Sequence, residues 1–157
     1  MPSKSAGVLA FRTRDGQIEV LLVHPGGPFW RNKDDGAWSI PKGEHSSDEA
    51  AELAARREFA EELGIELTVP LSPLGEVRQR GGKVVEAFAA QIDVDVLTVR
   101  SNTFEIEWPP RSGLRQSFPE IDRAEWFDLT MARVKINKAQ SALLDRLGTM
   151  LERRAGG

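Results

Sequence analysis

Three glutamates, Glu58, Glu61 and Glu62, have the types and spacing that could do chemistry. On a helix that turns about 100° per residue, they fall within one arc of roughly 100°. Carboxylates so close together repel one another unless a positive charge lies between them. Their oxygens are also the ligands that hard divalent cations such as Mg²⁺ prefer. The three carboxylates therefore suit a metal site that could serve phosphate chemistry.

The same three glutamates have a simpler interpretation. Glutamate-rich helices are commonly solvated surfaces, and Arg57 is placed to form an i,i+4 ion pair with Glu61. Taken alone, the pattern E-x-x-E-E favours the solvated surface. The residues on either side of the pattern change that balance.

Residues 43–65 resemble a complete Nudix box, whose pattern is G-x5-E-x7-R-E-U-x-E-E-x-G-U with U bulky and apolar. Every fixed position matches, and the matching residues are Gly43, Glu49, Arg57, Glu58, Glu61, Glu62 and Gly64. The resemblance implies an α/β fold, namely an α/β/α sandwich with a mixed β-sheet in which the box forms a loop–helix–loop. It also implies a hydrolase of phosphoanhydride bonds that requires Mg²⁺, with Mn²⁺ as a possible substitute.

The resemblance assigns roles within the box. Glu58, Glu61 and Glu62 would bind the metal ion, and one of them would orient or deprotonate the attacking water. The main-chain carbonyl of Gly43 would join the metal ligands. Glu49 and Arg57 are expected to hold the box together through an ion pair rather than to act on the substrate.

Glu120 is a further candidate for an auxiliary metal ligand or catalytic base. It lies six residues before Trp126, and a glutamate at this distance from a tryptophan resembles one found in the diadenosine-tetraphosphate group of the family. The alternative is a carboxylate in a surface loop, and the sequence does not choose between the two.

Lys42 is a candidate for phosphate binding. The segment 38–43 resembles the W-x-x-P-K-G lead-in of Nudix enzymes that hydrolyse diadenosine polyphosphates and diphosphoinositol polyphosphates. The resemblance implies that Lys42 contacts phosphate beside the metal, and the alternative is a solvated lysine. For Trp38, burial in the core is favoured over substrate contact.

Phe29, Trp30 and Arg111 are candidates for holding the rest of the substrate. The two aromatic side chains could stack on a nucleobase. The alternative, favoured for one of the two, is burial under the loop. Arg111 could reach phosphates or be an ordinary surface arginine. His24 and His45 do not form a metal pair by their spacing.

Strands and helices are mixed along the chain, which predicts a single α/β domain over residues 1–157 with flexible ends at about 1–4 and 153–157. We expect strands over 6–11, 19–23, 103–108 and 124–127, a loop over 25–36, and a hairpin over 74–92 that turns at Gly81-Gly82. A helix is expected over about 48–63, begun by a capping box of Ser46 and Glu49 and ended by Gly64. Another is expected over 139–151.

The composition excludes several classes of protein. The net charge of −3 lacks the basic excess of nucleic-acid-binding domains, so no nucleic-acid partner is expected. No apolar run is long enough to span a membrane. The chain has no cysteine, which excludes disulfides and thiolate sites and fits the cytoplasm. The oligomeric state cannot be predicted.

The leading hypothesis is an enzyme that cleaves a phosphoanhydride in a small nucleotide. A dinucleoside polyphosphate is the first substrate expected and a nucleoside triphosphate the second. The alternative is a nucleotide-sensing Nudix domain without catalysis. The intact glutamates of the box disfavour that alternative.

Overall fold

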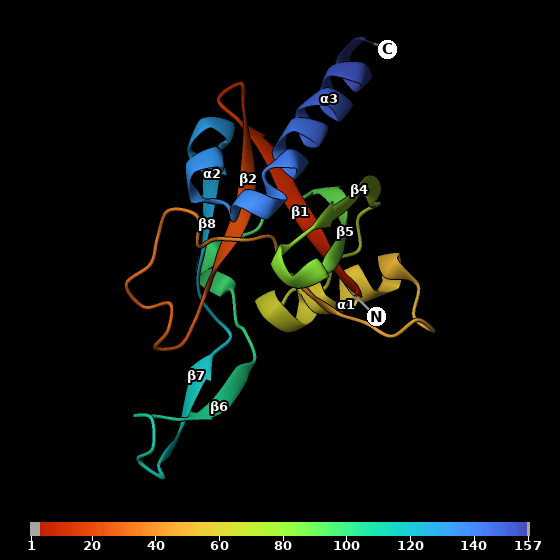
Figure 1. Cartoon of the computed structure of the whole chain (residues 1–157). Coiled ribbons are helices and arrows are strands. Elements are labelled where there is room, and N and C mark those ends of the chain that lie inside the picture. The colour runs from red at the N-terminus through yellow and green to blue at the C-terminus, as the bar shows by residue number, and fades with distance from the viewer. Residues whose placement is uncertain (1–3, 157) are drawn as a thin grey trace.

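The computed structural model describes residues 4–156, and its centre is a six-stranded mixed sheet (Figure 1). The strand order is β4-β5-β1-β2-β8, with β3 paired to β1 beside this path. β1 and β5 are parallel, and the other pairs are antiparallel. The bounds are β1 Lys4–Arg14, β2 Gln17–Pro25, β3 Lys42–Glu44, β4 Ser72–Arg78, β5 Val84–Gln91 and β8 Ile121–Asp128.

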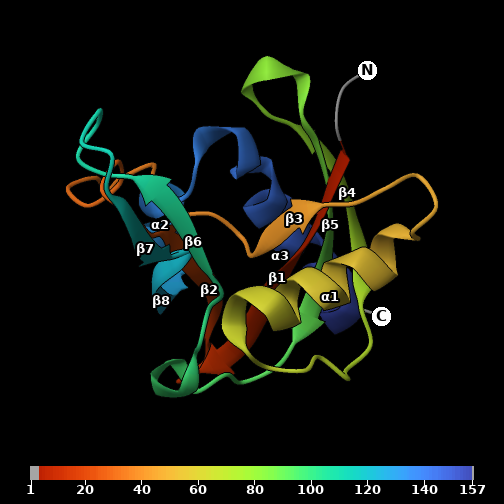
Figure 2. The same ribbon diagram turned by 90° about the horizontal axis from the view of Figure 1, so that it is seen from below.

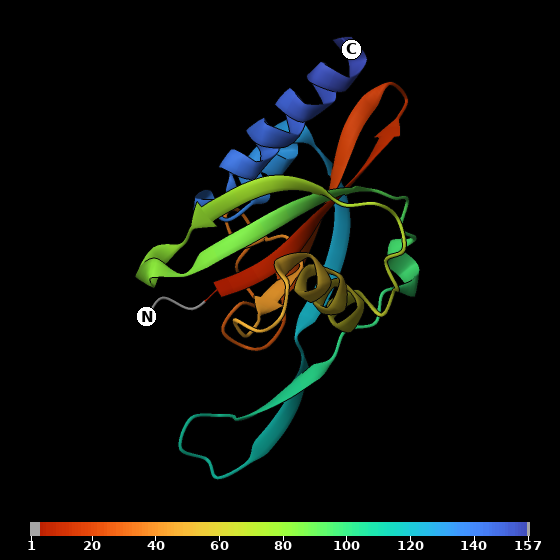
Figure 3. The ribbon, with the colours of Figure 1, turned by 90° about the vertical axis from the view of Figure 1, so that its right-hand side faces the viewer.

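Helices cover both faces of this sheet. α1 (Ala51–Leu63) packs on one face, where Phe59 and Leu63 enter a core with β1 and β5. α2 (Leu129–Lys135), the 3-10 helix η3 (Lys138–Gln140) and α3 (Ala142–Gly156) lie on the other face, which holds a second core around Trp38. Figure 3 shows the sheet between α1 and α3. The predicted α/β/α sandwich with a mixed sheet is confirmed.

A second, two-stranded sheet projects from the body of the molecule (Figures 1 and 3). It consists of β6 (Thr103–Glu107) and β7 (Arg115–Pro119), and we refer to residues 103–119 as the hairpin arm. An isolated hairpin is marginally stable in water, so its base needs support from the body. Gly26 and Gly27 give that support, because a Cβ on either would collide with Pro119 or Phe104.

Most of the predicted elements are present, with shifted ends. The β1–β2 turn, the loop after β2 and the β4–β5 hairpin lie where they were expected, and the hairpin turns through the 3-10 helix η1 (Arg80–Gly82). The strand expected at 103–108 pairs only within the hairpin arm. Four elements were not predicted, namely β3, α2, β7 and the 3-10 helix η2 (Val96–Thr98).

The predicted capping box is wrong. α1 begins at Ala51 rather than near Asp48, and its N-cap Ala50 receives no side-chain hydrogen bond. The Glu49 carboxylate binds Arg57 instead, because a charged partner outweighs a backbone amide. The predicted C-cap is confirmed, since Gly64 has φ 71° and donates its N–H to the carbonyl of Ala60.

The single domain over 1–157 and its flexible ends stay predictions. Lys4 begins β1, and residues 153–156 continue α3. Residues 1–3 and 157 lie outside the part of the chain that the structure describes. Within residues 4–156, no helix combines the length and the apolarity needed to cross a membrane.

Candidate metal and catalytic site

The helix α1 and the short strand β3 lie side by side at the predicted metal site (Figure 2). α1 is fixed by its buried side, which includes Ala54, Phe59 and Leu63. β3 is fixed by pairing with β1, where Gly43 lies opposite Ala6. The glutamates of the box are therefore positioned by two separately anchored elements.

Gly43 lets the carboxylate of Glu58 lie against the main chain of β3. A Cβ added at Gly43 would stand 2.0 Å from Oε2 of Glu58, which is far inside contact distance. Any side chain at position 43 would therefore displace this carboxylate. The fit gives a physical reason for glycine at the first position of the box.

The carboxylate of Glu62 binds the main chain of the same strand. The backbone amide of Lys42 donates to Oε2 of Glu62 over 3.0 Å. The pKa of Glu62 is raised to about 8, chiefly by burial and with contributions from the negative charges of Glu58 and Glu120, while the Lys42 amide opposes the shift. Burial is also the main cause that raises the pKa of Glu58, and the charges of Glu61 and Glu120 add to it. These carboxylates repel one another as a metal-binding group would in the absence of a cation.

Arg57 connects the carboxylates of the box. Its Nε and Nη2 donate to both oxygens of Glu49, over 2.9 and 2.8 Å. Its Nη1 donates to Glu58 over 2.7 Å and to Glu61 over 3.3 Å. The hydrogen bonds to Glu49 are the largest cause that raises the pKa of Arg57. This geometry supports a positioning role for Arg57 and Glu49, and it also contains the i,i+4 pair of the simpler interpretation.

The donor groups suit a divalent cation, although their present arrangement is spread out. Among residues 4–156, no three His, Asp or Glu side chains are placed to hold a metal ion together. Glu61 is 44% exposed and turned to Arg57. The site nevertheless offers the hard oxygen ligands that Mg²⁺ takes, and the Glu58 carboxylate occupies the space left by the missing side chain of Gly43.

Glu120 comes to this cluster from the base of the hairpin arm. It stands directly before β8, where its carbonyl accepts from Gly26 over 2.9 Å and its N–H donates to Asn102 over 2.8 Å. Its charge acts on both Glu58 and Glu62. The structure thus brings Glu120 towards the box, as its candidate role requires.

Lys42 is half-buried beside the carboxylates. Burial is the main cause that lowers its pKa, while the nearby charge of Glu62 opposes the shift and that of Lys83 adds to it. Lys83 also forms an ion pair with Glu44 over 3.4 Å. Lys83 was missed by sequence reasoning, since nothing in a hairpin-turn lysine indicates that the parallel pairing of β1 and β5 brings it to β3.

Phe29 and Trp30 are both exposed, by 65% and 39%, so the favoured burial of one of them under the loop is wrong. Phe29 meets Trp108 of the hairpin arm edge to face, with ring centroids 5.4 Å apart. Trp30 carries the ammonium group of Lys33 over its ring at 5.2 Å. The sequence offered Trp108 the same choice between stacking and burial, but its contact with Phe29 could not be predicted, because only the fold brings the two rings together.

Arg111 lies in the loop that joins β6 to β7, at the far end of the hairpin arm. Its backbone N–H donates to the carboxylate of Glu107 over 2.9 Å, and its side chain is exposed. The structure does not bring Arg111 to the glutamates of the box. A phosphate contact by Arg111 stays a prediction.

His24 and Trp38 anchor the loop that carries the two exposed aromatics. Trp38 is 1% exposed, which confirms the prediction that it belongs to the core. His24 is fully buried against the edge of Trp38, and its two ring nitrogens lie 2.8 Å from Asp122 and 2.6 Å from the carbonyl of Lys33. Both are structural residues, and the loop they hold is the segment 26–37.

A cavity of about 650 Å³ lies beside α2 and η3, where the end of the loop 26–37 approaches the β4–β5 hairpin. It is bordered by Gly36, Gln79 and Asn137 together with basic side chains. The buried amide of Gln140 connects its walls, because it accepts from Ile40 over 3.0 Å and donates to Gln79 over 2.8 Å. A cavity of this size could hold a nucleobase or a sugar.

The family model described as the NUDIX domain matches residues 1–147. No curated protein matches the chain.

Several solved structures share the fold. An Ap4A hydrolase of C. elegans in a binary complex has a TM-score of 0.68 at 22% identity, covering 94% of this chain and 98% of that one. The NUDIX domain of NrtR from Shewanella oneidensis, complexed with ADP ribose, has a TM-score of 0.66 at 18% identity, covering 96% and 89%. NrtR complexed with a 27mer DNA has a TM-score of 0.62 at 19% identity, covering 96% and 63%.

Proposed function

This chain belongs to the NUDIX family, and from that premise we propose that it hydrolyses a nucleoside diphosphate linked to a further group. As a Nudix hydrolase it acts on pyrophosphate bonds. A dinucleoside polyphosphate is the first substrate that we propose, and a nucleoside triphosphate is the second.

One observation carries the proposal: Glu58 and Glu62 converge on β3 at Gly43 and Lys42. The carboxylate of Glu58 fills the space at Gly43, and that of Glu62 accepts from the amide of Lys42. Carboxylates beside a lysine supply the groups that phosphoanhydride hydrolysis requires. The carboxylates can bind a cation and orient or deprotonate a water molecule, and the lysine can neutralise charge on the phosphates.

We assign the roles as follows. Glu58, Glu61, Glu62 and the carbonyl of Gly43 would hold Mg²⁺, or Mn²⁺ in its place. When bound, the ion supplies positive charge to the phosphate oxygens and lowers the pKa of a water molecule. Glu120 would add a carboxylate from the segment between β7 and β8, as auxiliary ligand or base. Lys42 would neutralise a phosphate.

The choice of substrate rests on the lead-in segment and on the aromatics. The lead-in 38–43 resembles that of diadenosine-polyphosphate hydrolases. Phe29 and Trp30 are exposed and offer rings to a base. A structural neighbour is named as an Ap4A hydrolase, and at 22% identity its likeness extends to the fold alone.

A panel of substrates tests this proposal. The protein is incubated with diadenosine polyphosphates, nucleoside triphosphates and ADP-ribose, with Mg²⁺ and after removal of metal by a chelator. Products are separated by chromatography. We expect cleavage of a dinucleoside polyphosphate that stops on chelation and is lost in Glu62→Gln. The matched control is Glu52→Gln, an exposed glutamate on the same helix.

Binding without turnover would overturn the catalytic proposal. If every compound stays intact with Mg²⁺ and with Mn²⁺ while one of them binds, a nucleotide-sensing domain takes its place. The NrtR neighbours favour this second candidate, since one is complexed with ADP ribose and another with DNA. The absence of a nucleic-acid partner therefore stays a prediction, and a cytoplasmic location is part of the proposal.

A further inference from the structure

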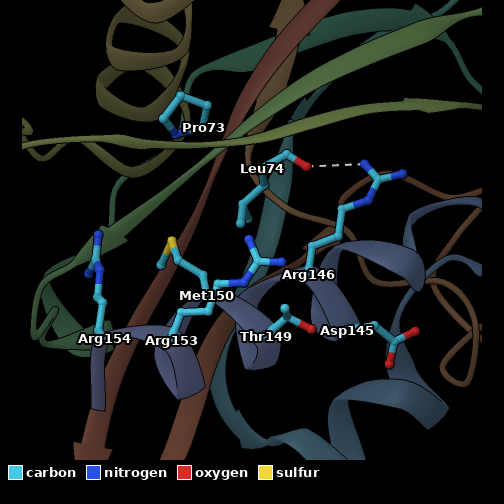
Figure 4. Close-up of a pocket in the computed structure, with 8 residues that line it drawn as sticks. All are labelled: Pro73, Leu74, Asp145, Arg146, Thr149, Met150, Arg153 and Arg154. Atoms are coloured by element: carbon cyan, nitrogen blue, oxygen red, sulfur yellow. Dashed lines mark hydrogen bonds between the residues drawn. The ribbon is translucent and has the colours of Figure 1, made fainter. Parts of the chain in front are cut away.

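A groove lies between β4 and α3, on the face of the sheet opposite α1 (Figure 4). Its volume is about 570 Å³, which is within the range of small-molecule sites. Because the sheet separates it from α1, the groove does not belong to the carboxylate site. Neither the box nor the substrate proposal uses any residue that lines it.

The floor of the groove is apolar. Leu74 is buried, Met150 is half-buried, and Pro73 of β4 also lines the groove. Methionine adapts its shape to different apolar ligands because its chain is unbranched and its sulfur is polarizable. This floor would accept an aliphatic chain or a ring.

Three arginines on one side of α3 surround this floor (Figure 4). Arg146 is fixed by two hydrogen bonds, to the carbonyls of Leu74 at 3.1 Å and Glu76 at 2.9 Å. Arg154 is fixed by its hydrogen bond to Ser72 over 2.6 Å. Both guanidinium groups keep further N–H donors, because each has five.

None of these arginines is neutralised within residues 4–156. Arg153 has neither a hydrogen-bond partner nor an ion-pair partner in that range, and no carboxylate pairs with Arg146 or Arg154. The one acidic residue at the groove, Asp145, is already paired with Arg133. An uncompensated group of guanidiniums around an apolar floor fits an anion with an apolar body.

A second hollow of about 340 Å³ adjoins the groove and shares Arg154 with it. Phe11, Val69 and Pro70 line this second hollow, so its wall is also largely apolar. The bond between Arg154 and Ser72 stands where the two meet. A chain longer than the groove would therefore find more apolar surface beyond the arginine.

We propose that this groove is a second ligand site, which binds a small amphipathic anion with a phosphate or carboxylate head and an apolar body. The head is bound by Arg153 and by the free donors of Arg146 and Arg154. The body lies on Leu74 and Met150. The site is separate from substrate hydrolysis, and its ligand carries both the anionic head and the apolar body.

Calorimetry with octyl phosphate, below its micellar concentration, tests the proposal. Inorganic phosphate is the probe that carries the charge without the chain, and neutral octyl glucoside is the probe that carries the chain without the charge. We expect saturable binding of octyl phosphate, with about tenfold weaker binding of each single-feature probe. A free-phosphate site would instead bind inorganic phosphate as tightly, which would overturn the amphipathic ligand.

Two charge reversals complete the experiment. Arg153→Glu should weaken octyl phosphate binding by about tenfold or more, because it replaces an attraction by a repulsion. Arg14→Glu makes the same change of charge at an exposed residue on the end of β1 and should leave binding unchanged. Hydrolysis should be unaffected in both variants. Equal weakening by both, or no saturable binding up to about 1 mM, would overturn the site.

Discussion

The box and the hairpin arm approach each other at Glu120, which directly follows the arm, but the two regions differ in how many contacts fix their side chains. In the box, Arg57 binds three carboxylates and Gly43 receives the carboxylate of Glu58 at close range. The arm consists of two strands that pair with each other, and Leu114 near its tip is 60% exposed. The difference is consistent with the proposal that the body fixes the reacting groups, while substrate recognition is left to segments that can change without disturbing them.

Removing a carboxylate of the box should give the largest effect. Glu58→Gln and Glu62→Gln should each lower kcat by about 10³-fold, since each removes a charge at the reacting phosphate. Their circular dichroism and melting temperature should stay near those of the wild type. Glu52→Gln on the same helix should keep full activity. If Glu58→Gln lowered kcat less than Glu120→Gln did, the comparison would be contradicted, because the residue at the base of the arm would then contribute more to catalysis than the box does.

Filling the space at Gly43 should be the next largest effect. In Gly43→Ala the new Cβ would stand 2.0 Å from Glu58, so the carboxylate must move. We expect kcat to fall by about 10²-fold through misplacement alone. The control Gly148→Ala lies in α3 with nothing within 4 Å of its Cβ, and it should raise stability by about 0.5–1 kcal/mol. Unchanged kcat in Gly43→Ala would show that Glu58 needs no fixed position.

Removing aromatics from the arm and its loop should affect binding rather than chemistry. Phe29→Ala should raise KM by about tenfold for a dinucleoside substrate, because stacking on a base contributes about 1–3 kcal/mol. Trp108→Ala should also raise KM, because Phe29 packs against the ring of Trp108. We expect kcat to change by less than about threefold. Steady-state kinetics on both variants measure this. A loss confined to kcat would mean that the arm takes part in catalysis.

The smallest effect concerns the hydrogen bonds that hold the loop 26–37. Asp34 accepts from Lys135 over 2.7 Å and from the ring N–H of Trp38 over 2.8 Å. The hydrogen bond from Lys135 is the largest cause that lowers the pKa of Asp34. A lowered pKa stabilises the fold above the ordinary value of 3.8, and this stability is lost as the pH falls through the folded value.

Asp34→Asn should therefore melt slightly below the wild type at pH 7, and the difference should shrink towards pH 3. Thermal melting followed across this range gives the measurement. Asp15→Asn, at the exposed β1–β2 turn, is the control. A difference that grows on acidification would contradict the assigned sign.

The box could be predicted from the sequence because its spacing is local. Glu58, Glu61 and Glu62 share a helix, so their relation follows from helical geometry. The hydrogen bonds of Arg57 to Glu49 and Glu61 lie within the same short segment. The capping box failed within that segment, because the pattern cannot show that Glu49 has a stronger partner.

The arm could not be predicted in the same way. The alternation of residues 103–108 indicated a strand, but it did not show that β6 would pair with β7 outside the main sheet. Trp108 meets Phe29 across a long separation in sequence, and Lys83 reaches Glu44 through the pairing of two other strands. Such contacts depend on the fold, and no local spacing encodes them.

Arg146 also bears on how the protein behaves at high concentration. β4 is an edge strand, and edge strands with open carbonyls pair readily with strands of other molecules, which is a common start of aggregation. Arg146 occupies the carbonyls of Leu74 and Glu76 and places its charge there. We expect this edge to resist the addition of a strand from another molecule. Concentrated samples should therefore not form fibrils through β4.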